Sequence, residues 1–369
     1  MISRECFFAA ALALLAACPL AAWADPQYTV TFVPPGFEPG PFDAMNNAGR
    51  VVGTYQDHAA IWDGSGILTL NLPPSLGRGI NDHMDISGVE RRNGTAFALI
   101  GGNFIDIHAT LPSLYYTSDG YAINNRGSVA GIADPFADEA VRGFLYRNGQ
   151  SELVPTLGGD FSFAINLNNN DAVVGWASTG QGSVNDPFTH AIIYHDGSLQ
   201  DLGTLGTGQR SFGFDINDCG WAVGYSFIQP EELSASVHPF LFRDGKMMDL
   251  GTLGGDFGEA RAINNLGLVV GDSLNAEGLL TAFIWKGDKL VDLNTLTALP
   301  AGWRLESAMD INDKGQILGT ACNGPNPEDC ARVRLDLVSA VPEPSPAPML
   351  AAGMGLLAWG RRRMRRRTA

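Results

Sequence analysis

One short phrase recurs along almost the whole chain, and this repetition constrains the fold more than any other feature. Clear copies are AINNLGLVVGDS from Ala262, AINNRGSVAGIA from Ala122 and DINDKGQILGTA from Asp310. Every copy carries an asparagine at the same place, and these residues are Asn46, Asn81, Asn124, Asn168, Asn217, Asn264 and Asn312. Most neighbouring asparagines are 43 to 49 residues apart, and the first two are separated by 35. Such a period is typical of a protein built from repeated structural units.

Each repeat predicts about four short β-strands. In the Ile-Asn-Asn-x-Gly phrase, asparagine can bond its own backbone and glycine can take a positive φ, so the phrase predicts a turn. The β-branched run that follows predicts a strand. A second phrase, such as HPFLF at His238, is followed by an Asp-Gly turn and MMDLGTLGG, which together predict a hairpin. No useful helical period occurs between residues 25 and 340, so we expect an all-β protein.

Four strands in about 45 residues are typical of a propeller blade. We therefore expect residues 25–340 to form one repeat domain, a seven-bladed β-propeller. The strand predicted at Tyr28 lacks a preceding hairpin partner, and the strand at Ala331 lacks a following one. We expect these two end strands to pair and close the ring, which would remove two exposed edges. The alternative is a linear β-solenoid, in which both end strands stay unpaired.

Residues 1–24 predict an export signal. An apolar run from Phe7 to Ala17 precedes Ala22 and Ala24, which frame a small-x-small cleavage site. The segment that ends at Cys18 resembles a lipobox, so cleavage there with lipidation of Cys18 is an alternative. A retained N-terminal anchor is a further alternative, although the apolar run is short for a membrane span.

The last residues, 341–369, have a different composition. The 14 apolar residues from Ala347 to Gly360 would span roughly 21 Å as a helix, against about 30 Å for the hydrocarbon core. They predict a marginal transmembrane helix that depends on its flanks. The following arginines should hold their end in the cytoplasm. They are Arg361, Arg362, Arg363, Arg365, Arg366 and Arg367.

The order of Val341, Pro342, Glu343 and Pro344, a short apolar helix and an arginine cluster resembles the PEP-CTERM sorting signal of Gram-negative bacteria. This resemblance implies processing by an exosortase, a membrane transpeptidase, after transient anchoring in the inner membrane. It also implies a place on the cell surface or among exopolysaccharide. Over residues 44–320 the phrases resemble the HAF family of extracellular repeats, which implies export and no defined activity. An ordinary C-terminal anchor with a proline-rich stalk is the alternative.

Charge and cysteines fit an exported protein. Residues 25–340 hold 17 lysines and arginines against 37 aspartates and glutamates, an excess of about 20 negative charges that disfavours nucleic acid as a partner. Cys322 and Cys330 frame a short loop, and in an oxidising compartment we expect them to form a disulfide. Closure of that loop would contribute roughly 2–3 kcal/mol.

Recognised catalytic and metal-binding motifs are absent from the sequence. There is no His-Glu-x-x-His, no Gly-x-Ser-x-Gly and no phosphate-binding glycine loop. His58, His190 and His238 share a repeat position that also accepts Arg142 and Thr281, so we predict no histidine metal site. The phrases at Asp215 and Asp310 lack the ligand spacing of a calcium loop, and we interpret them as turns. We predict no cofactor, with calcium between blades as an alternative.

Two kinds of residue remain as candidates for a functional site, namely acids outside the repeat and tryptophans that the repeat does not require. The acids outside the repeat are Asp160, Asp256, Glu231 and Glu232. Asp201, Asp249 and Asp292 follow the repeat, and we interpret them as architectural. Trp176, Trp221 and Trp303 stand where the repeat does not require tryptophan, and either pack between blades or contact sugars.

We therefore expect an exported, non-catalytic binding or scaffolding module that meets exopolysaccharide or another matrix component. The alternative is a carbohydrate-active hydrolase or lyase on the same ring. An enzyme should show a deep axial pocket with two or more carboxylates and a strongly shifted acid. A binding module should show a shallow rim with aromatic residues and no acid with a strongly shifted pKa.

Overall fold

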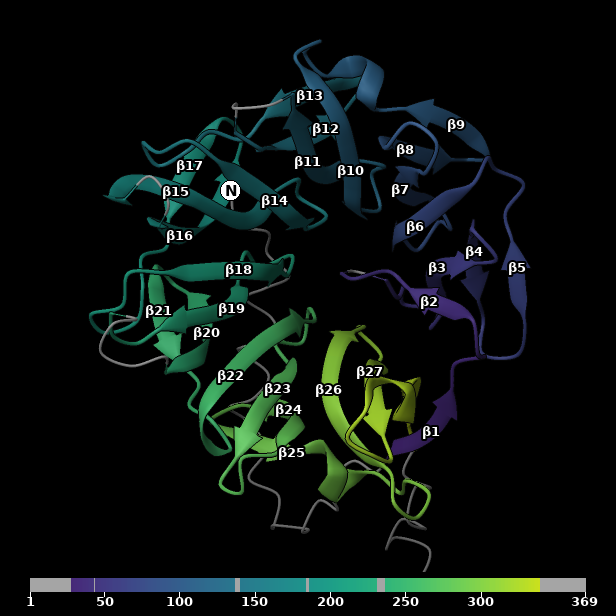
Figure 1. Cartoon of the computed structure of the whole chain (residues 1–369), viewed down its shortest axis with the longest axis vertical. Coiled ribbons are helices and arrows are strands. Elements are labelled where there is room, and N and C mark those ends of the chain that lie inside the picture. Colours follow the sequence, from purple (N-terminus) through teal and green to yellow (C-terminus); the bar gives the residue numbers. More distant parts are fainter. Residues whose placement is uncertain (1–27, 43, 137–139, 184–185, 231–235, 339–369) are drawn as a thin grey trace, which may run out of the picture.

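The computed structural model describes residues 28–42, 44–136, 140–183, 186–230 and 236–338. The predicted signal peptide with Ala22 and Ala24, the sorting tail from Val341 and the acids Glu231 and Glu232 lie outside these residues. Figure 1 shows that the described strands form a ring of sheets around a central axis. The protein is therefore an all-β propeller, as the sequence predicts.

Five sheets of the described chain have four strands each. The first two are β2 (Phe37–Pro39), β3 (Val51–Tyr55), β4 (His58–Trp62), β5 (Ile67–Thr69), and β6 (Ser75–Ile80), β7 (Ile86–Glu90), β8 (Thr95–Ile100), β9 (Asn103–Asp106). The next two are β10 (Tyr115–Ile123), β11 (Val129–Pro135), β12 (Arg142–Arg147), β13 (Gln150–Leu153), and β14 (Ser162–Leu167), β15 (Val173–Ser183), β16 (Asp186–His195), β17 (Ser198–Asp201). The fifth contains β26 (Arg304–Ile311), β27 (Ile317–Cys322), β28 (Cys330–Leu337) and β1 (Tyr28–Phe32).

The sixth sheet in the described residues has eight strands. They are β18 (Ser211–Ile216), β19 (Ala222–Phe227), β20 (Val237–Arg243), β21 (Lys246–Asp249), β22 (Gly254–Ile263), β23 (Val269–Asn275), β24 (Leu280–Lys286) and β25 (Lys289–Asp292). A single parallel pair, Val237 with Phe257, connects its two halves. The described chain thus has five separate four-stranded blades where the sequence predicts seven, because this pairing merges β18–β25 into one sheet. Short 3₁₀ helices are η2 (His108–Thr110), η3 (Leu293–Leu296) and η4 (Pro327–Asp329).

The two end strands close the ring. β1 pairs antiparallel with β28, with Tyr28 opposite Leu337 and Phe32 opposite Val333. The expected closure is therefore confirmed, and the solenoid alternative is wrong because the terminal strands pair with each other and leave no open end. At the other end of β28, Cys322 and Cys330 form the expected disulfide across the adjacent ends of β27 and β28.

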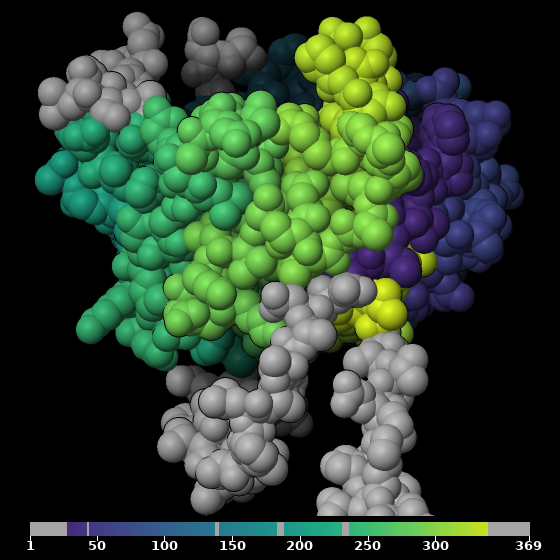
Figure 2. All heavy atoms as spheres, turned by 90° about the horizontal axis from the view of Figure 1, so that it is seen from below, coloured from purple at the N-terminus to yellow at the C-terminus, as the bar shows by residue number. Residues whose placement is uncertain are grey.

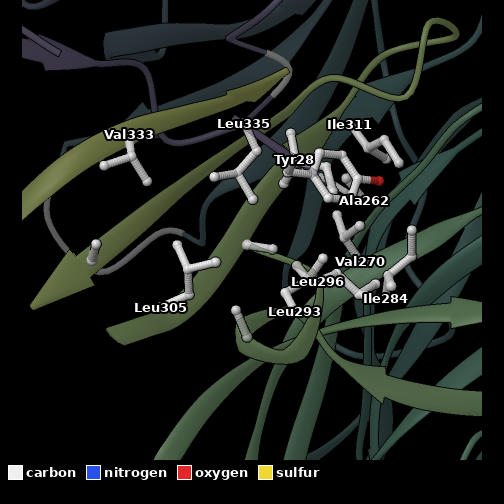
Figure 3. Packing of buried hydrophobic residues seen from close by; sticks show 14 residues of the cluster. Tyr28, Ala262, Val270, Ile284, Leu293, Leu296, Leu305, Ile311, Val333 and Leu335 are labelled. Carbon is white, nitrogen blue, oxygen red and sulfur yellow. The ribbon is translucent and has the colours of Figure 1, made fainter. Parts of the chain in front are cut away.

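The hydrophobic core lies between neighbouring sheets. Val51 and Val52 are successive residues of β3, and both are fully buried, because each sheet packs against a neighbour on both of its faces. In Figure 3, Val270 and Ile284 of one sheet lie near Leu293 and Leu296, which continue toward Leu305 of the next sheet. A sheet buried on both faces explains why the repeat contains continuous apolar runs rather than a strict alternation.

The glycine in the Val-Val-Gly phrase has a steric cause. At Gly175 and Gly271, a Cβ atom would collide with the main-chain oxygens of Phe163 and Glu259 on the adjacent inner strand. Only glycine allows the two innermost strands to approach this closely. No helix among the described residues is long and apolar enough to cross a membrane.

Candidate functional site at the ring axis

The repeat asparagines meet at one end of the ring axis and form a closed ring of hydrogen bonds. Each Nδ2 donates to the main-chain oxygen of the next repeat asparagine at 2.9–3.2 Å, and Asn312 closes the circle on Asn46. Each of these side chains is almost fully buried. One repeated residue therefore joins every repeat to the next. We call this set the asparagine ring.

The same side chains also build the turns. In Asn264, Oδ1 accepts hydrogen bonds from the amides of Leu266 at 3.1 Å and Leu268 at 3.0 Å, and Gly267 follows with a φ of 77°. The interpretation of the phrase as a turn is thus confirmed. The link to the next repeat was not predicted, because a turn within one repeat does not show what lies beside it.

A second ring of hydrogen bonds surrounds the same end of the axis. The residue after each ring asparagine donates its amide to the side-chain oxygen of its counterpart in the next repeat at 2.8–2.9 Å. These residues are Asn47, Asp82, Asn125, Asn169, Asp218, Asn265 and Asp313. The sequence signal for this second ring was the constant Asn or Asp at that position.

A cavity of about 120 Å³ lies on the axis beside the two rings, and Asp215 and Asp310 line it. Asp215 accepts hydrogen bonds from the amide of Ile263 at 2.7 Å and from Asn166 Nδ2 at 2.8 Å. Asp310 accepts one from the amide of Met45 at 2.8 Å. Both carboxylates therefore connect one repeat to another. The sequence placed them in turns and did not predict that they share a cavity.

The environment of these two acids favours their neutral forms. Burial raises the pKa of Asp215 to about 7, against the opposing effect of the Ile263 amide, and the nearby Asp310 raises it further. Burial likewise raises the pKa of Asp310 to about 6. Asp215 is surrounded by protein, although part of its side chain is accessible from the cavity. The cavity therefore holds two carboxyl groups that change charge near neutral pH.

The size of the cavity limits what it can hold. Pockets for small-molecule ligands usually measure about 300–1,000 Å³, whereas one water takes up about 30 Å³ of liquid. The axial cavity thus has room for a few waters or an ion and not for a sugar chain. Within the described part of the chain, three possible metal-ligating atoms of His, Cys, Asp or Glu come within 4.8 Å of one another at Glu306, Cys322 and Cys330. Those two cysteines are bonded to each other, so this group does not form a metal site.

Above the cavity, three aromatic side chains from different blades contact one another. Phe42 lies 5.6 Å from Tyr121 and 6.2 Å from Phe214, measured between ring centroids. Phe42 follows β2, and Figure 1 shows this purple segment reaching toward the middle of the ring. Tyr121 and Phe214 stand three residues before their ring asparagines, so this contact lies farther along the inner strands than the asparagine ring.

Beyond that layer, the inner strands carry residues that differ from blade to blade. Aromatic rings line β14, β15, β18 and β19, with centroid distances of 5.0 Å for Phe163–Trp176, 5.3 Å for Trp176–Phe212 and 4.9 Å for Phe212–Tyr225. Together with Phe214, which also belongs to the layer with Phe42 and Tyr121, these half-buried residues are called the aromatic wall. Of the tryptophans that the sequence proposed, Trp176 belongs to this wall.

Charged residues flank the aromatic wall on both sides. Arg78 pairs with Asp119 at 2.7 Å on β6 and β10, and Arg261 of β22 pairs with Glu259 at 2.6 Å and Asp272 at 2.8 Å. Burial raises the pKa of Asp119, Glu259 and Asp272, and the arginines oppose that effect. The sequence did not single out these residues, because neither an ion pair between blades nor one across neighbouring strands leaves a recognisable pattern in the repeat.

The other predicted candidates lie elsewhere. Trp221 packs under Arg243, and Trp303 packs against Phe32. Asp160 and Asp256 are exposed and do not line the axial cavity.

The repeat histidines have structural partners. His190 and His238 bond Asp201 and Asp249 at 2.8–3.0 Å, and His58 bonds the main-chain oxygen of Leu72. Each of the two aspartates also accepts an amide hydrogen bond from a glycine two residues on, which supports the interpretation that they are architectural.

A hollow of about 590 Å³ adjoins the asparagine ring on the side of β14–β19, with Arg126, Arg147 and His195 in its lining. Arg126 faces Asp171 at 3.6 Å, and Arg147 pairs with Glu152 at 3.1 Å and Asp196 at 3.2 Å. The hollow has the volume of a ligand pocket, but its arginines already have carboxylate partners.

No family model and no curated protein matches the chain. Solved structures do. The β-propeller domain of the Trilobed protease from Pyrococcus furiosus is similar at 10% identity and a TM-score of 0.50, over 83% of this chain and 100% of that chain. An acylaminoacyl peptidase from Pyrococcus horikoshii matches at 11% identity, a TM-score of 0.49, and 78% of this chain. A gluconolactonase from Xanthomonas campestris matches at 15% identity and a TM-score of 0.39, over 83% of this chain and 100% of that chain.

These likenesses concern the fold. The chain spans about half the length, 46%, of the acylaminoacyl peptidases that it matches. At 10% identity, the likeness to the protease domain shows a shared propeller architecture and nothing about activity.

Proposed function

We propose that this chain is an exported protein of the cell surface or exopolysaccharide matrix, processed by an exosortase, and that its ring is a non-catalytic binding or scaffolding module. In this proposal the eight-stranded sheet acts as two blades, β18–β21 and β22–β25, so that the ring has seven. The four-stranded order in each half and the seven members of the asparagine ring support that count.

One observation carries the non-catalytic role. The polar residues that the repeats share are engaged in hydrogen bonds between repeats, and the two acids at the axis accept amides of the neighbouring repeat. A catalytic acid needs a free oxygen within reach of a substrate. The small axial cavity leaves no space for a polysaccharide there.

The position of the last strand supports attachment through the tail. Leu337 lies beside Gly315, and Gln316 bonds Asp336, so β28 ends at the face that carries the asparagine ring. The sequence continues from there toward the predicted sorting motif at Val341. The opposite face, with the Cys322–Cys330 loop, would then point away from the membrane. Figure 2 views the ring from its edge and shows the described residues near the C-terminus, in yellow, reaching both faces.

A hydrolase or lyase is the second candidate, and the raised pKa values of Asp215 and Asp310 favour it. A carboxylic acid with a pKa of about 7 can donate a proton at neutral pH. Its weakness is access, because the cavity of about 120 Å³ that holds both groups has no room for a sugar chain.

Cell fractionation tests export and sorting. In a bacterium that has an exosortase, the chain should lose its tail and reach the surface or medium, and the double variant Pro342→Ala, Glu343→Ala should remain full-length in the inner membrane. A variant in the neck, Pro348→Ala, is the control. Equal processing of both variants, or an intact wild-type chain in the cytosol, would contradict the proposal.

An assay for new reducing ends separates the two candidate functions. The purified chain should release none from neutral or acidic polysaccharides. Release that disappears in Asp215→Asn would instead establish the hydrolase or lyase.

A further inference from the structure

We propose that the aromatic wall, Phe163, Trp176, Phe212, Phe214 and Tyr225, binds the sugar rings of an uncharged polysaccharide. This inference deepens the proposed binding function by naming the site and the class of ligand. The argument rests on the position of the rings, the residues at the same level in other repeats and the charges that surround them.

The aromatic wall is not required by the repeat. Phe163 and Phe212 stand five residues before their ring asparagines, and the same position holds Leu76, Asp119, Glu259 and Ser307 in other repeats. Their partners across the first strand pair, Trp176 and Tyr225, correspond to Val89, Ile132, Asp272 and Thr320. Aromatic residues thus gather at these positions in two neighbouring repeats, although the other repeats show that the fold accepts small and charged residues there.

The wall is also accessible. Each of its five side chains is half-buried, whereas core aromatics such as Phe240 and Phe283 are fully buried. Phe214 belongs both to the wall and to the layer with Phe42 and Tyr121. Phe212 stands two residues farther from the ring asparagine on the same strand, so the wall extends from that layer toward the end of the axis away from the asparagine ring. If β28 leads to the tether, this end of the ring faces outward.

The surroundings favour sugars over purely apolar ligands. A sugar ring has an apolar face of C–H groups that packs on an aromatic face, and an edge of hydroxyls that needs hydrogen-bond partners. Asp119 with Arg78 borders the wall on one side, and Glu259 with Arg261 borders it on the other. Arg261 also lies over the ring of Phe214, with its Cζ 5.8 Å from the centroid. Aromatic rings that can contact the faces of a sugar and charged groups that can bond its hydroxyls are therefore present side by side.

The charges favour an uncharged chain. The bordering arginines, Arg78 and Arg261, already pair with carboxylates within 2.8 Å. Residues 25–340 carry an excess of about 20 negative charges, which repels an acidic polysaccharide. Hydroxyl groups can bond these ion pairs without displacing them.

Affinity electrophoresis tests the site with defined probes. The full chain, purified in mild detergent, is run through native gels that contain galactomannan, xyloglucan or dextran, and through gels that contain alginate. We expect retardation by at least one of the three neutral polymers and none by alginate. Trp176→Ala and Phe212→Ala should each weaken the apparent affinity at least tenfold.

Trp221→Ala is the matched control, since Trp221 is also half-buried but lies on the face of the asparagine ring. It should keep wild-type retardation, and unfolding midpoints should show that all variants are folded. No retardation in any neutral gel, stronger retardation by alginate, or equal loss in Trp176→Ala and Trp221→Ala would overturn the inference. Cell fractionation is independent of this assay, so a failure of glycan binding and a failure of export can be told apart.

Discussion

The two ends of the inner strands differ in how far the repeats agree in sequence. At the end of the asparagine ring, equivalent residues make equivalent hydrogen bonds in every repeat. At the other end, equivalent positions hold Leu76, Asp119, Phe163, Phe212, Glu259 and Ser307. Repetition therefore marks the residues that assemble the ring. A binding site should be sought where the repeats differ, because the fold does not determine those side chains.

The largest effect is expected at the asparagine ring. Asn264→Ala leaves the buried main-chain oxygen of Asn312 without its donor and the partly buried amides of Leu266 and Leu268 without their acceptor. We expect a loss of about 3–4 kcal/mol in the free energy of unfolding, because unsatisfied buried groups cost about 1–3 kcal/mol each. Denaturant unfolding measures it. Asn265→Ala, at the exposed neighbour, should cost clearly less, and equal losses would contradict the special role of the ring.

The disulfide stabilises the end of the ring opposite the asparagine ring. Replacement of Cys322 and Cys330 by alanine should lower stability by about 2.5 kcal/mol, since the bond closes a short loop. The measurement is the unfolding midpoint of the wild-type chain with and without reductant, beside that of the double variant. If reductant also destabilised the double variant by this amount, the effect would not come from this disulfide.

The pH dependence of stability should report on the axial cavity. Burial raises the pKa of Asp215 from about 3.8 to about 7, so the folded state holds its proton more tightly than the unfolded state. The stabilising contribution is complete below pH 4 and is lost as the pH rises to 7. The full shift of the pKa corresponds to about 4 kcal/mol, and the partial exposure of Asp215 to the cavity roughly halves this value. Relative to wild type, Asp215→Asn should therefore gain about 2 kcal/mol between pH 4 and pH 8. A stability difference that is constant with pH would show that Asp215 is ionised throughout.

The smallest effect is expected at His238, at the end of the ring opposite the asparagine ring. Burial of Asp249 favours a higher pKa, but the hydrogen bonds from His238 and from the amide of Gly251 outweigh it and hold the pKa below its usual range. His238→Thr copies the residue that Thr281 places at this position, and should cost less than about 1 kcal/mol because the pair is partly exposed. A loss as large as that of Asn264→Ala would erase the contrast between the two ends.

Much of the fold could be predicted because its sequence signals are local. The period between asparagines, the glycines of the turns and the strand phrases predicted an all-β ring, its closure by the strands at Tyr28 and Ala331, and the disulfide. The candidate site was predicted less well. Trp176 was identified from its departure from the repeat, whereas Phe163, Phe212, Arg261 and the shared cavity of Asp215 and Asp310 were not.

The sequence by itself determined the repeating unit, because turns and strands depend on residues that are close along the chain. Only the tertiary structure decided which residues face the axis, which acids share a cavity and which sheets merge through a pair such as Val237 with Phe257. Those relations connect residues about 20 to 266 positions apart, and they exist only after the ring has closed. The physical reason is that burial and pairing between blades depend on the curvature of the whole ring.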